Sequence, residues 1–243
     1  MRLHINVDHV ATLRNARGTA YPDPVEAARM CLEAGAHGIT AHLREDRRHI
    51  RDDDVERLRA ALKSKSVFNL EMASTDEMIA IALRVVPEVV TLVPERREER
   101  TTEGGLEVAN AGASLRAHVA ALQAAKIKVS LFIAPDLAQV EASRAIGAEQ
   151  IELHTGVYAH ADADADAEKR EIARLAAAAV RGRELGLEIA AGHGLTTNNV
   201  PSLVAIPEIV ELNIGHAVIA DAVFAGLPAT VRAFLAAIAK GRA

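Results

Sequence analysis

The chain has 243 residues and a mass of 25.8 kDa, and half of its residues are hydrophobic while a quarter are charged, as is typical of a globular protein with a well-filled core. A net charge of -5 and only four Phe, two Tyr and no Trp argue against a nucleic-acid partner, because such a partner needs a basic face and aromatic rings for base stacking. The N-terminus lacks an apolar signal segment and no stretch approaches ~18 uninterrupted apolar residues, so we expect a cytoplasmic protein with no membrane partner.

Eight short apolar runs of strand length follow one another along the chain. They are residues 3–7, 38–43, 67–72, 89–93, 129–134, 151–154, 187–191 and 209–214. Because most of these runs are apolar throughout and do not alternate, we expect both of their faces to be covered, as in a parallel sheet.

Helical patterns separate the runs. They cover residues 24–34, 55–64, 76–85, 114–125, 137–145, 168–185, 217–224 and 229–239. Pro24 and Gly35 are typical of the start and end of a helix, and Ser74 and Thr75 are suitable N-caps. Residues 8–24 are expected to form a polar, arginine-bearing connection, and the run ADADADAE at 161–168 a solvated loop.

The strand-then-helix order and the length predict one domain, residues 1–243, folded as an α/β protein, a single (β/α)8 TIM barrel with additional helices. An open doubly wound sheet is the alternative. Against it, no G-x-G-x-x-G follows the first strand, where Asp8 and His9 stand instead.

In such a barrel the active site forms where the strands end. Polar side chains gather at these ends, and five of the ten histidines are among them. The set is Asn6, Asp8, His9, His42, Arg44, Asn69, Glu71, Glu152, His154, His193, Asn213 and His216. A lone histidine at a strand end is commonly structural, but burying this many polar groups without a function would be costly, so the set indicates catalysis.

Three glycines at the strand ends indicate that the site binds a phosphate group. Gly192, Gly194 and Gly215 allow backbone N–H groups to approach a ligand, and a short helix starting near His216 would direct its positive end to the same place. Loops after the seventh and eighth strands form the recurrent phosphate site of these barrels. Arginines after the first two strands suggest a second anion site: Arg14, Arg17 and Arg44. We interpret Arg47, Arg48 and Arg51 as solvated surface.

Other chemistries fit less well. The histidines and carboxylates could bind a metal, but they lie on different strands and show no His-x-His or His-x-x-x-His spacing. No G-x-S-x-G motif is present, and Cys31 lies on a helical pattern. We therefore expect no metal.

Seven segments together resemble the signatures of the pyridoxine 5'-phosphate synthase family, from the deoxyxylulose-dependent route to vitamin B6. They are NVDHVATLRNARG, TAHLREDRRHI, FNLEMA, LVPERREERTTEGG, IELHTG, AAGHGLT and NIGH, and they span the chain from the first to the eighth strand. The resemblance implies a (β/α)8 barrel assembled as a homo-octamer built from dimers.

The resemblance also implies a reaction. The enzyme would condense two phosphorylated small molecules, 1-deoxy-D-xylulose 5-phosphate and 3-amino-2-oxopropyl phosphate, to pyridoxine 5'-phosphate, phosphate and water, without a cofactor. His42 and Glu71 would accept protons, His193 would donate one, and Glu152 would stabilise charge in the transition state. The residues implied to hold the aminoketone phosphate are Asn6, Arg17, Gly194, Gly215 and His216. Those implied to hold the deoxyxylulose phosphate are Asp8, His9, Arg44, His49 and Thr101.

Two alternatives remain open at this point. A metal-assisted aldolase or isomerase could use the same residues on one sugar phosphate. A catalytically silent barrel could bind a phosphorylated metabolite and signal through its oligomer surface, although phosphate binding alone has no use for His42 opposite His193. We further expect a loop after the fourth strand, with Thr101 to Gly105, to close over the site.

Overall fold

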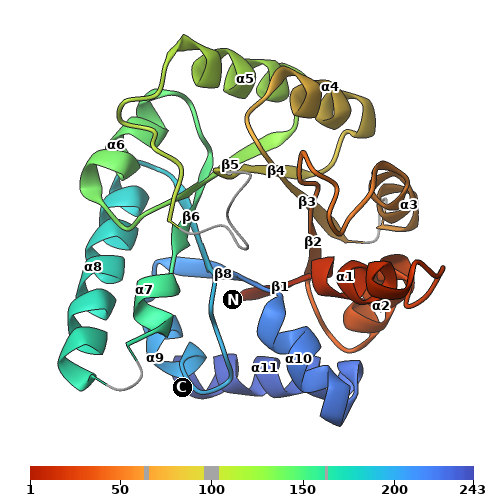
Figure 1. Cartoon of the computed structure of the whole chain (residues 1–243). Coiled ribbons are helices and arrows are strands. Elements are labelled where there is room, and N and C mark those ends of the chain that lie inside the picture. The colour runs from red at the N-terminus through yellow and green to blue at the C-terminus, as the bar shows by residue number, and fades with distance from the viewer. Residues whose placement is uncertain (63–65, 96–103, 162–163) are drawn as a thin grey trace.

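The computed structural model describes residues 1–62, 66–95, 104–161 and 164–243, and these form a closed barrel of eight parallel strands inside a ring of helices (Figure 1). The strands pair in chain order, and β8 closes the barrel by pairing with β1. Their bounds are β1 Arg2–Asn6, β2 Gly38–His42, β3 Val67–Met72, β4 Val89–Leu92, β5 Lys128–Ile133, β6 Gln150–His154, β7 Glu188–Gly192 and β8 Ile209–Ile214. The predicted (β/α)8 fold is confirmed, and the open sheet is excluded.

The helices pack around the outside of this barrel. Their bounds are α1 Asp8–Arg17, α2 Pro24–Glu33, α3 Asp52–Leu62, α4 Asp76–Val85, α5 Ala113–Ala124, α6 Leu137–Ala145, α7 Gly156–Ala159, α8 Ala165–Glu184, α9 Val200–Val204, α10 His216–Ala225 and α11 Leu227–Arg242. Thr75 caps α4 as expected, since its side chain accepts a hydrogen bond from the N–H of Met78. Within the described residues, no helix has the length and apolar character needed to cross a membrane.

Two helix predictions were wrong. Residues 8–17 form α1 and not a polar connection, because Val10 and Ala11 pack inward while Gly18 ends the helix in the left-handed region with φ 63°. The helix α8 begins inside the ADADADAE run, because the side chain of Asp164 caps it by accepting hydrogen bonds from the N–H groups of Asp166 and Ala167. The short helices α7 and α9 were not predicted.

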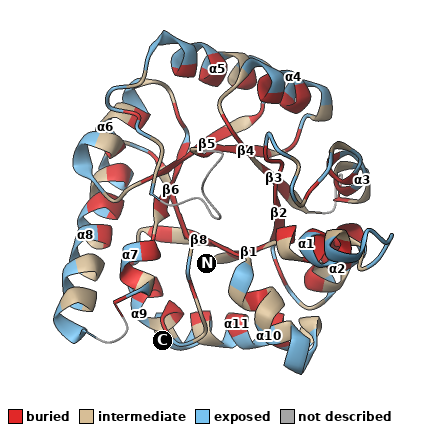
Figure 2. Cartoon of the chain, in the orientation of Figure 1, coloured by how far each residue is buried: buried red, intermediate tan, exposed pale blue. Residues whose placement is uncertain are grey.

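The expectation that both faces of the strands are covered is confirmed, but only the outer face is apolar along its whole length. On β1, Leu3 and Ile5 belong to the hydrophobic core, whereas Arg2, His4 and Asn6 contact side chains of other strands inside the barrel. Figure 2 shows that the strands are nevertheless buried along most of their length. Each fully buried Leu or Ile facing the helices contributes about 1.5–3 kcal/mol, so the outer faces supply the core.

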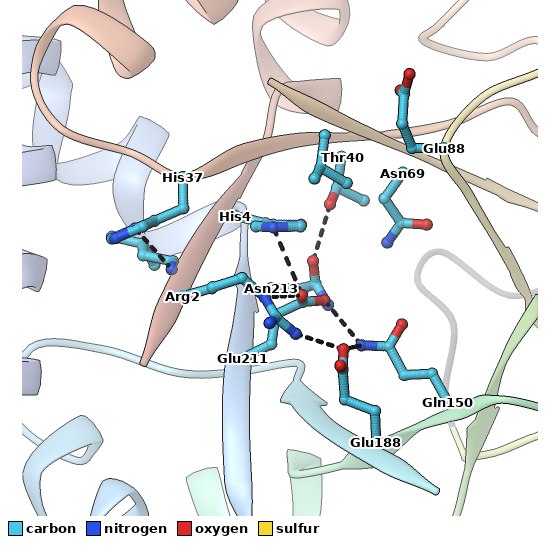
Figure 3. A network of polar contacts seen from close by, with 12 residues as sticks. Arg2, His4, His37, Thr40, Asn69, Glu88, Gln150, Glu188, Glu211 and Asn213 are labelled. Carbon is cyan, nitrogen blue, oxygen red and sulfur yellow. Dashed lines mark hydrogen bonds and ion pairs between the residues drawn. The ribbon is translucent and has the colours of Figure 1, made fainter. Parts of the chain in front are cut away.

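The interior of the barrel is therefore a polar network (Figure 3). Glu188 accepts hydrogen bonds from Arg2, Lys128 and Gln150, and Glu211 accepts from Arg2. A register shift between β7 and β8 beside Ile189 precedes the position of Glu211. These ion pairs fill the amino-terminal end of the barrel, and the carboxyl ends of the strands, the barrel mouth, are left to the candidate site.

Candidate active site

One half of the candidate site is built by β1, β2 and β3. His42 and Glu71 are paired positions on β2 and β3, and Nδ1 of His42 lies 4.0 Å from Oε2 of Glu71. Nδ2 of Asn6 donates to the same carboxylate oxygen at 3.5 Å. Asp8, at the start of α1, accepts the backbone N–H of His42 at 2.8 Å. The structure thus brings together four residues that the sequence predicted to form the site.

Glu71 is tuned for proton transfer. Burial raises the pKa of its carboxyl to about 7, against the opposing attraction of His42 and with a further rise from the nearby Asp8. A carboxylate with such a pKa is ionised about half the time at neutral pH and binds a proton more strongly than an exposed one. This is the property that a general base needs when it works near pH 7.

His42 also contacts a residue that the sequence reasoning did not assign. Oε1 of Glu95, just after β4, lies 2.8 Å from Nε2 of His42. Burial lowers the pKa of His42, but the hydrogen bond with Glu95 and the charges of Glu71 and Asp8 outweigh it, so the net shift is upward. The available sequence signal was a carboxylate directly after a barrel strand, the same signal that identified the other site residues.

The other half of the site centres on Glu152 of β6. Burial raises the pKa of its carboxyl well above its usual range, and the charges of Glu71 and Glu211 add to the rise. Nδ2 of Asn213 donates to Oε2 of Glu152 at 2.8 Å, and the hydroxyl of Thr40 donates to Asn213 at 2.9 Å. Burial and these charges therefore favour the protonated form of Glu152, which is the form that can donate a hydrogen bond to an oxygen that gains negative charge.

A glycine makes room for that carboxyl group. A Cβ at Gly192 would lie 2.3 Å from Oε1 of Glu152 and 2.8 Å from the carbonyl oxygen of Asn213. Gly192 is thus required for close packing against Glu152. The sequence pattern alone predicts a phosphate-binding role for this glycine.

His193 follows directly and has a left-handed backbone, with φ 87°. A non-glycine residue in this region costs about 1–2 kcal/mol. The buried hydroxyl of Thr155 holds the segment, with its oxygen 2.6 Å from the carbonyl oxygen of His193 and 2.7 Å from that of Gly192. The strained conformation at a strand end supports a functional role for the imidazole of His193.

His154 lies beside it, with the two ring centroids 4.9 Å apart. Burial, with the neighbouring His193 and His160, lowers the pKa of His154 to about 4, so this ring is neutral at physiological pH. Phe132 packs edge-on against it, and Gly156 is needed because a Cβ there would lie 2.7 Å from the ring. His193 therefore has a neutral neighbour that does not compete for a proton.

The predicted phosphate elements also lie at the barrel mouth. Gly194 has φ 77°, and α10 begins at His216 directly after Gly215. A Cβ at Gly215 would lie 2.9 Å from Cβ of Asn6, so β8 and β1 approach closely. The ring centroids of His9 and His216 are 4.9 Å apart, so the first turns of α1 and α10 lie next to each other.

The arginines that follow β1 and β2 differ in burial and in their ion-pair partners. Arg14 is buried and pairs with both carboxylate oxygens of Asp54, at 2.6 and 2.8 Å, so it links α1 to α3 and is not an anion site. Arg47, which we expected to be solvated, is only partly exposed and pairs with Asp52 at 3.1 Å. Arg17 is exposed in the last turn of α1, about 13 Å along the helix axis from Asp8.

The remaining predicted binding residues lie after β2 or outside the described residues. Arg44 is buried at the end of β2, with its Nε 3.4 Å from Asp46. The ring of His49 lies 5.9 Å from that of His42. Thr101 is outside the described residues, as is most of the segment that we expected to close over the site.

Among the described residues, one cluster has the spacing of a metal site. One potential ligand atom from each of Asp8, His42 and His49 lies within 4.8 Å of the other two. Two of these groups already have partners. The Nε2 of His42 contacts Glu95, and Asp8 accepts the N–H of His42. The cluster keeps the metal-assisted alternative open to experiment.

Comparison with known sequences gives matches over nearly the whole chain. Residues 3–240 match the family described as "Pyridoxal phosphate biosynthesis protein PdxJ". The pyridoxine 5'-phosphate synthase of Xanthobacter autotrophicus is 56% identical over 245 residues, covering 100% of this chain and 95% of that protein. The one from Thioalkalivibrio sulfidiphilus is 54% identical over 242 residues, covering 100% of this chain and 97% of that protein.

Solved structures share the fold at low identity. Thiamine phosphate pyrophosphorylase from Pyrococcus furiosus has a TM-score of 0.66 at 13% identity, covering 100% of this chain and 97% of that one. Phosphoribosyl anthranilate isomerase from Thermus thermophilus has a TM-score of 0.61 at 14% identity, covering 98% of each chain. At these identities the likeness shows the barrel alone.

Proposed function

Because this chain belongs to the pyridoxine 5'-phosphate synthase family and is an enzyme of that kind, we propose that its barrel mouth condenses 1-deoxy-D-xylulose 5-phosphate with 3-amino-2-oxopropyl phosphate. The products are pyridoxine 5'-phosphate, phosphate and water. The chemistry is general acid–base catalysis by protein side chains.

The observation that carries this proposal is a pair of buried carboxyl groups with raised pKa values, Glu71 and Glu152, at one barrel mouth. A histidine accompanies each carboxyl group. Nδ1 of His42 lies 4.0 Å from Oε2 of Glu71, and His193 directly follows Gly192, the glycine that packs against Glu152. A reaction that joins an amine to a ketone, expels phosphate and water and closes an aromatic ring needs several proton transfers. A site that only binds a phosphorylated metabolite would not need them.

The roles are those that the family resemblance implies, and the geometry supports them. Glu71 and His42 accept protons, first from the substrate ammonium, which must lose one to become a nucleophile. His193 protonates the oxygen that leaves as water. The protonated form of Glu152, which accepts a hydrogen bond from Asn213, donates to an oxygen that becomes negative in the transition state.

The two phosphates position the substrates. The backbone around Gly194, Gly215 and His216 holds the aminoketone phosphate at the start of α10, where helix N–H groups attract anions, and Asn6 and Arg17 belong to the same set. The family resemblance assigns the deoxyxylulose phosphate to Asp8, His9, Arg44, His49 and Thr101, the last of which is outside the described residues. Fixing both substrates in this way supplies part of the rate enhancement.

Assembly and location complete the proposal. The chain forms a homo-oligomer, an octamer built from dimers, and works in the cytoplasm as a single domain. Light scattering on the purified protein tests the assembly, and a monomer at micromolar concentration would contradict it.

The experiment that tests the reaction mixes the purified protein with both substrates and follows a fluorescent pyridine product and released phosphate together. Each substrate alone is the control, and a chelator-treated sample is run in parallel. Equal formation of pyridine and phosphate that survives the chelator supports the proposal. Absence of the pyridine contradicts it, and loss of turnover with removal of a stoichiometric divalent ion favours the metal-assisted alternative.

A further inference from the structure

The carboxylate of Glu95 is held at both oxygens. Oε1 lies 2.8 Å from Nε2 of His42, and Oε2 accepts the backbone N–H of Glu45 at 3.0 Å. The side chain is only 4% exposed, and that of His42 is 7% exposed. A carboxylate held in this way leaves the imidazole of His42 little freedom to rotate.

This contact distinguishes the two ring nitrogens of His42. A carboxylate only accepts hydrogen bonds, so Nε2 must carry a proton to bind Glu95. In the neutral ring, Nδ1 then has the free lone pair. Nδ1 is the atom that lies 4.0 Å from Glu71, and it is therefore on the side of the other proposed base.

We propose that Glu95 is a positioning residue for His42, which fixes Nε2 as the protonated nitrogen and makes Nδ1 the atom that exchanges protons with the substrate and Glu71. This inference rests on the proposed function, in which His42 accepts a proton. Glu95 itself does not touch the reacting atoms. It extends the pair of His42 and Glu71 to a carboxylate–imidazole–carboxylate series contributed by β2, β3 and the segment just after β4.

Charges from every neighbouring element act on this series. Glu71 faces His42 from β3, Asp8 from the start of α1 and His49 from the segment after β2, while Arg44 of that segment acts on Glu95. Burial raises the pKa of Glu95, but its bonds to His42 and to the N–H of Glu45, with the charge of Arg44, lower it further than burial raises it. Glu95 is therefore ionised, and its charge stabilises the protonated form of His42.

The test changes the charge and keeps the shape. In Glu95→Gln, the amide oxygen can still accept from Nε2, but the negative charge is gone. We expect kcat to fall about 10-fold. The pH midpoint of His42, followed by ¹⁵N NMR of histidine-labelled protein, should move to lower pH, because the charge that favours the protonated ring is removed. Glu33→Gln, an exposed carboxylate on α2, is the matched control and should change neither value.

The tautomer is a second readout that a merely structural role would not produce. The His42 signals are identified by their loss in His42→Asn. In the unmodified protein, neutral His42 should show a protonated Nε2 and an unprotonated Nδ1. In Glu95→Ala, which lacks the acceptor, both tautomers should appear. An unprotonated Nε2 in the unmodified protein, or a pH midpoint of His42 that Glu95→Gln leaves in place, would overturn the inference.

The double variant separates this inference from the proposed function. If Glu95 acts through His42, then Glu95→Gln costs nothing further in turnover when His42 is already Asn. Full turnover in His42→Asn alone would remove His42 from the mechanism, so the roles of His42 and Glu95 would both fail while the proposed reaction would stand. Reduced turnover in His42→Asn, with an equal additional loss in the double variant, would contradict only the role of Glu95.

Discussion

Oε2 of Glu71 lies 4.0 Å from Nδ1 of His42, and the two residues are paired positions on neighbouring parallel strands. Parallel pairing places equivalent strand ends side by side, so the sheet itself sets this separation. Both side chains are largely buried, at 14% and 7% exposed. Proton transfer between them therefore depends on the register of β2 and β3 and not on a loop.

Activity should depend on the ionisation of Glu71. Its pKa of about 7 means that the base form is lost as the pH falls through neutrality. We expect kcat/KM to rise with pH between about 6 and 8 and Glu71→Gln to lower kcat by about 10²-fold. Steady-state rates from pH 5.5 to 9 measure both. Unchanged turnover in Glu71→Gln would falsify the role of Glu71 as proton acceptor.

The same pKa shift makes a prediction for stability. The folded-state pKa of Glu71 is raised above the ordinary value of 4.5, so ionisation opposes folding, and this cost is present above about pH 7 and absent below about pH 4.5. Glu71→Gln should then increase the free energy of unfolding by about 1–3 kcal/mol at pH 8 and change it little at pH 4.5. Urea unfolding at the two pH values tests this, and an equal loss of stability at both would contradict it.

The sequence was sufficient to predict the barrel and most of the site, because strand ends can be recognised locally. Asn6, His42 and Glu71 each lie on or directly at the end of an apolar run, and closure of eight parallel strands brings those ends together. The family signatures lie at the same positions. The family resemblance and the strand register thus give the same set of residues.

Side-chain pairing could not be predicted in the same way. Arg14 and Arg17 read alike in the sequence, but only Arg14 faces Asp54, a partner on another helix. The sequence pattern does not predict the polar interior of the barrel. Inward-facing residues such as Thr40 and Ala190 are small, so these strands look like continuous apolar runs. Glu95 was passed over because its partner, His42, is 53 residues away in the chain.

The substitution His193→Asn should lower kcat while leaving the free energy of unfolding nearly unchanged. The φ of 87° at His193 suits Asn, which tolerates the left-handed region better than most residues. We expect His193→Asn to fold with a free energy of unfolding within about 1 kcal/mol of the unmodified protein, while kcat falls by about 10²-fold or more. Binding of the two phosphorylated substrates, measured by calorimetry, should persist. Loss of binding with little effect on kcat would instead place His193 in the phosphate site.

Gly192 offers the sharpest test of how the barrel mouth is packed. In Gly192→Ala, the new Cβ would lie 2.3 Å from Oε1 of Glu152 and 2.8 Å from the carbonyl oxygen of Asn213. The carbonyl of Asn213 belongs to the backbone and has little room to shift, so the side chain of Glu152 must move. Its hydrogen bond with Asn213 would then lengthen or break.

We expect Gly192→Ala to cost about 1–3 kcal/mol of stability, as overpacking does, and to lower kcat without a matching rise in KM, because Glu152 acts in the transition state. Gly112→Ala is the control, since its φ is -72° and no heavy atom lies within 4 Å of the added Cβ. If Gly192→Ala instead raised KM for the aminoketone phosphate and left kcat intact, Gly192 would belong to the phosphate site after all, as the sequence had indicated.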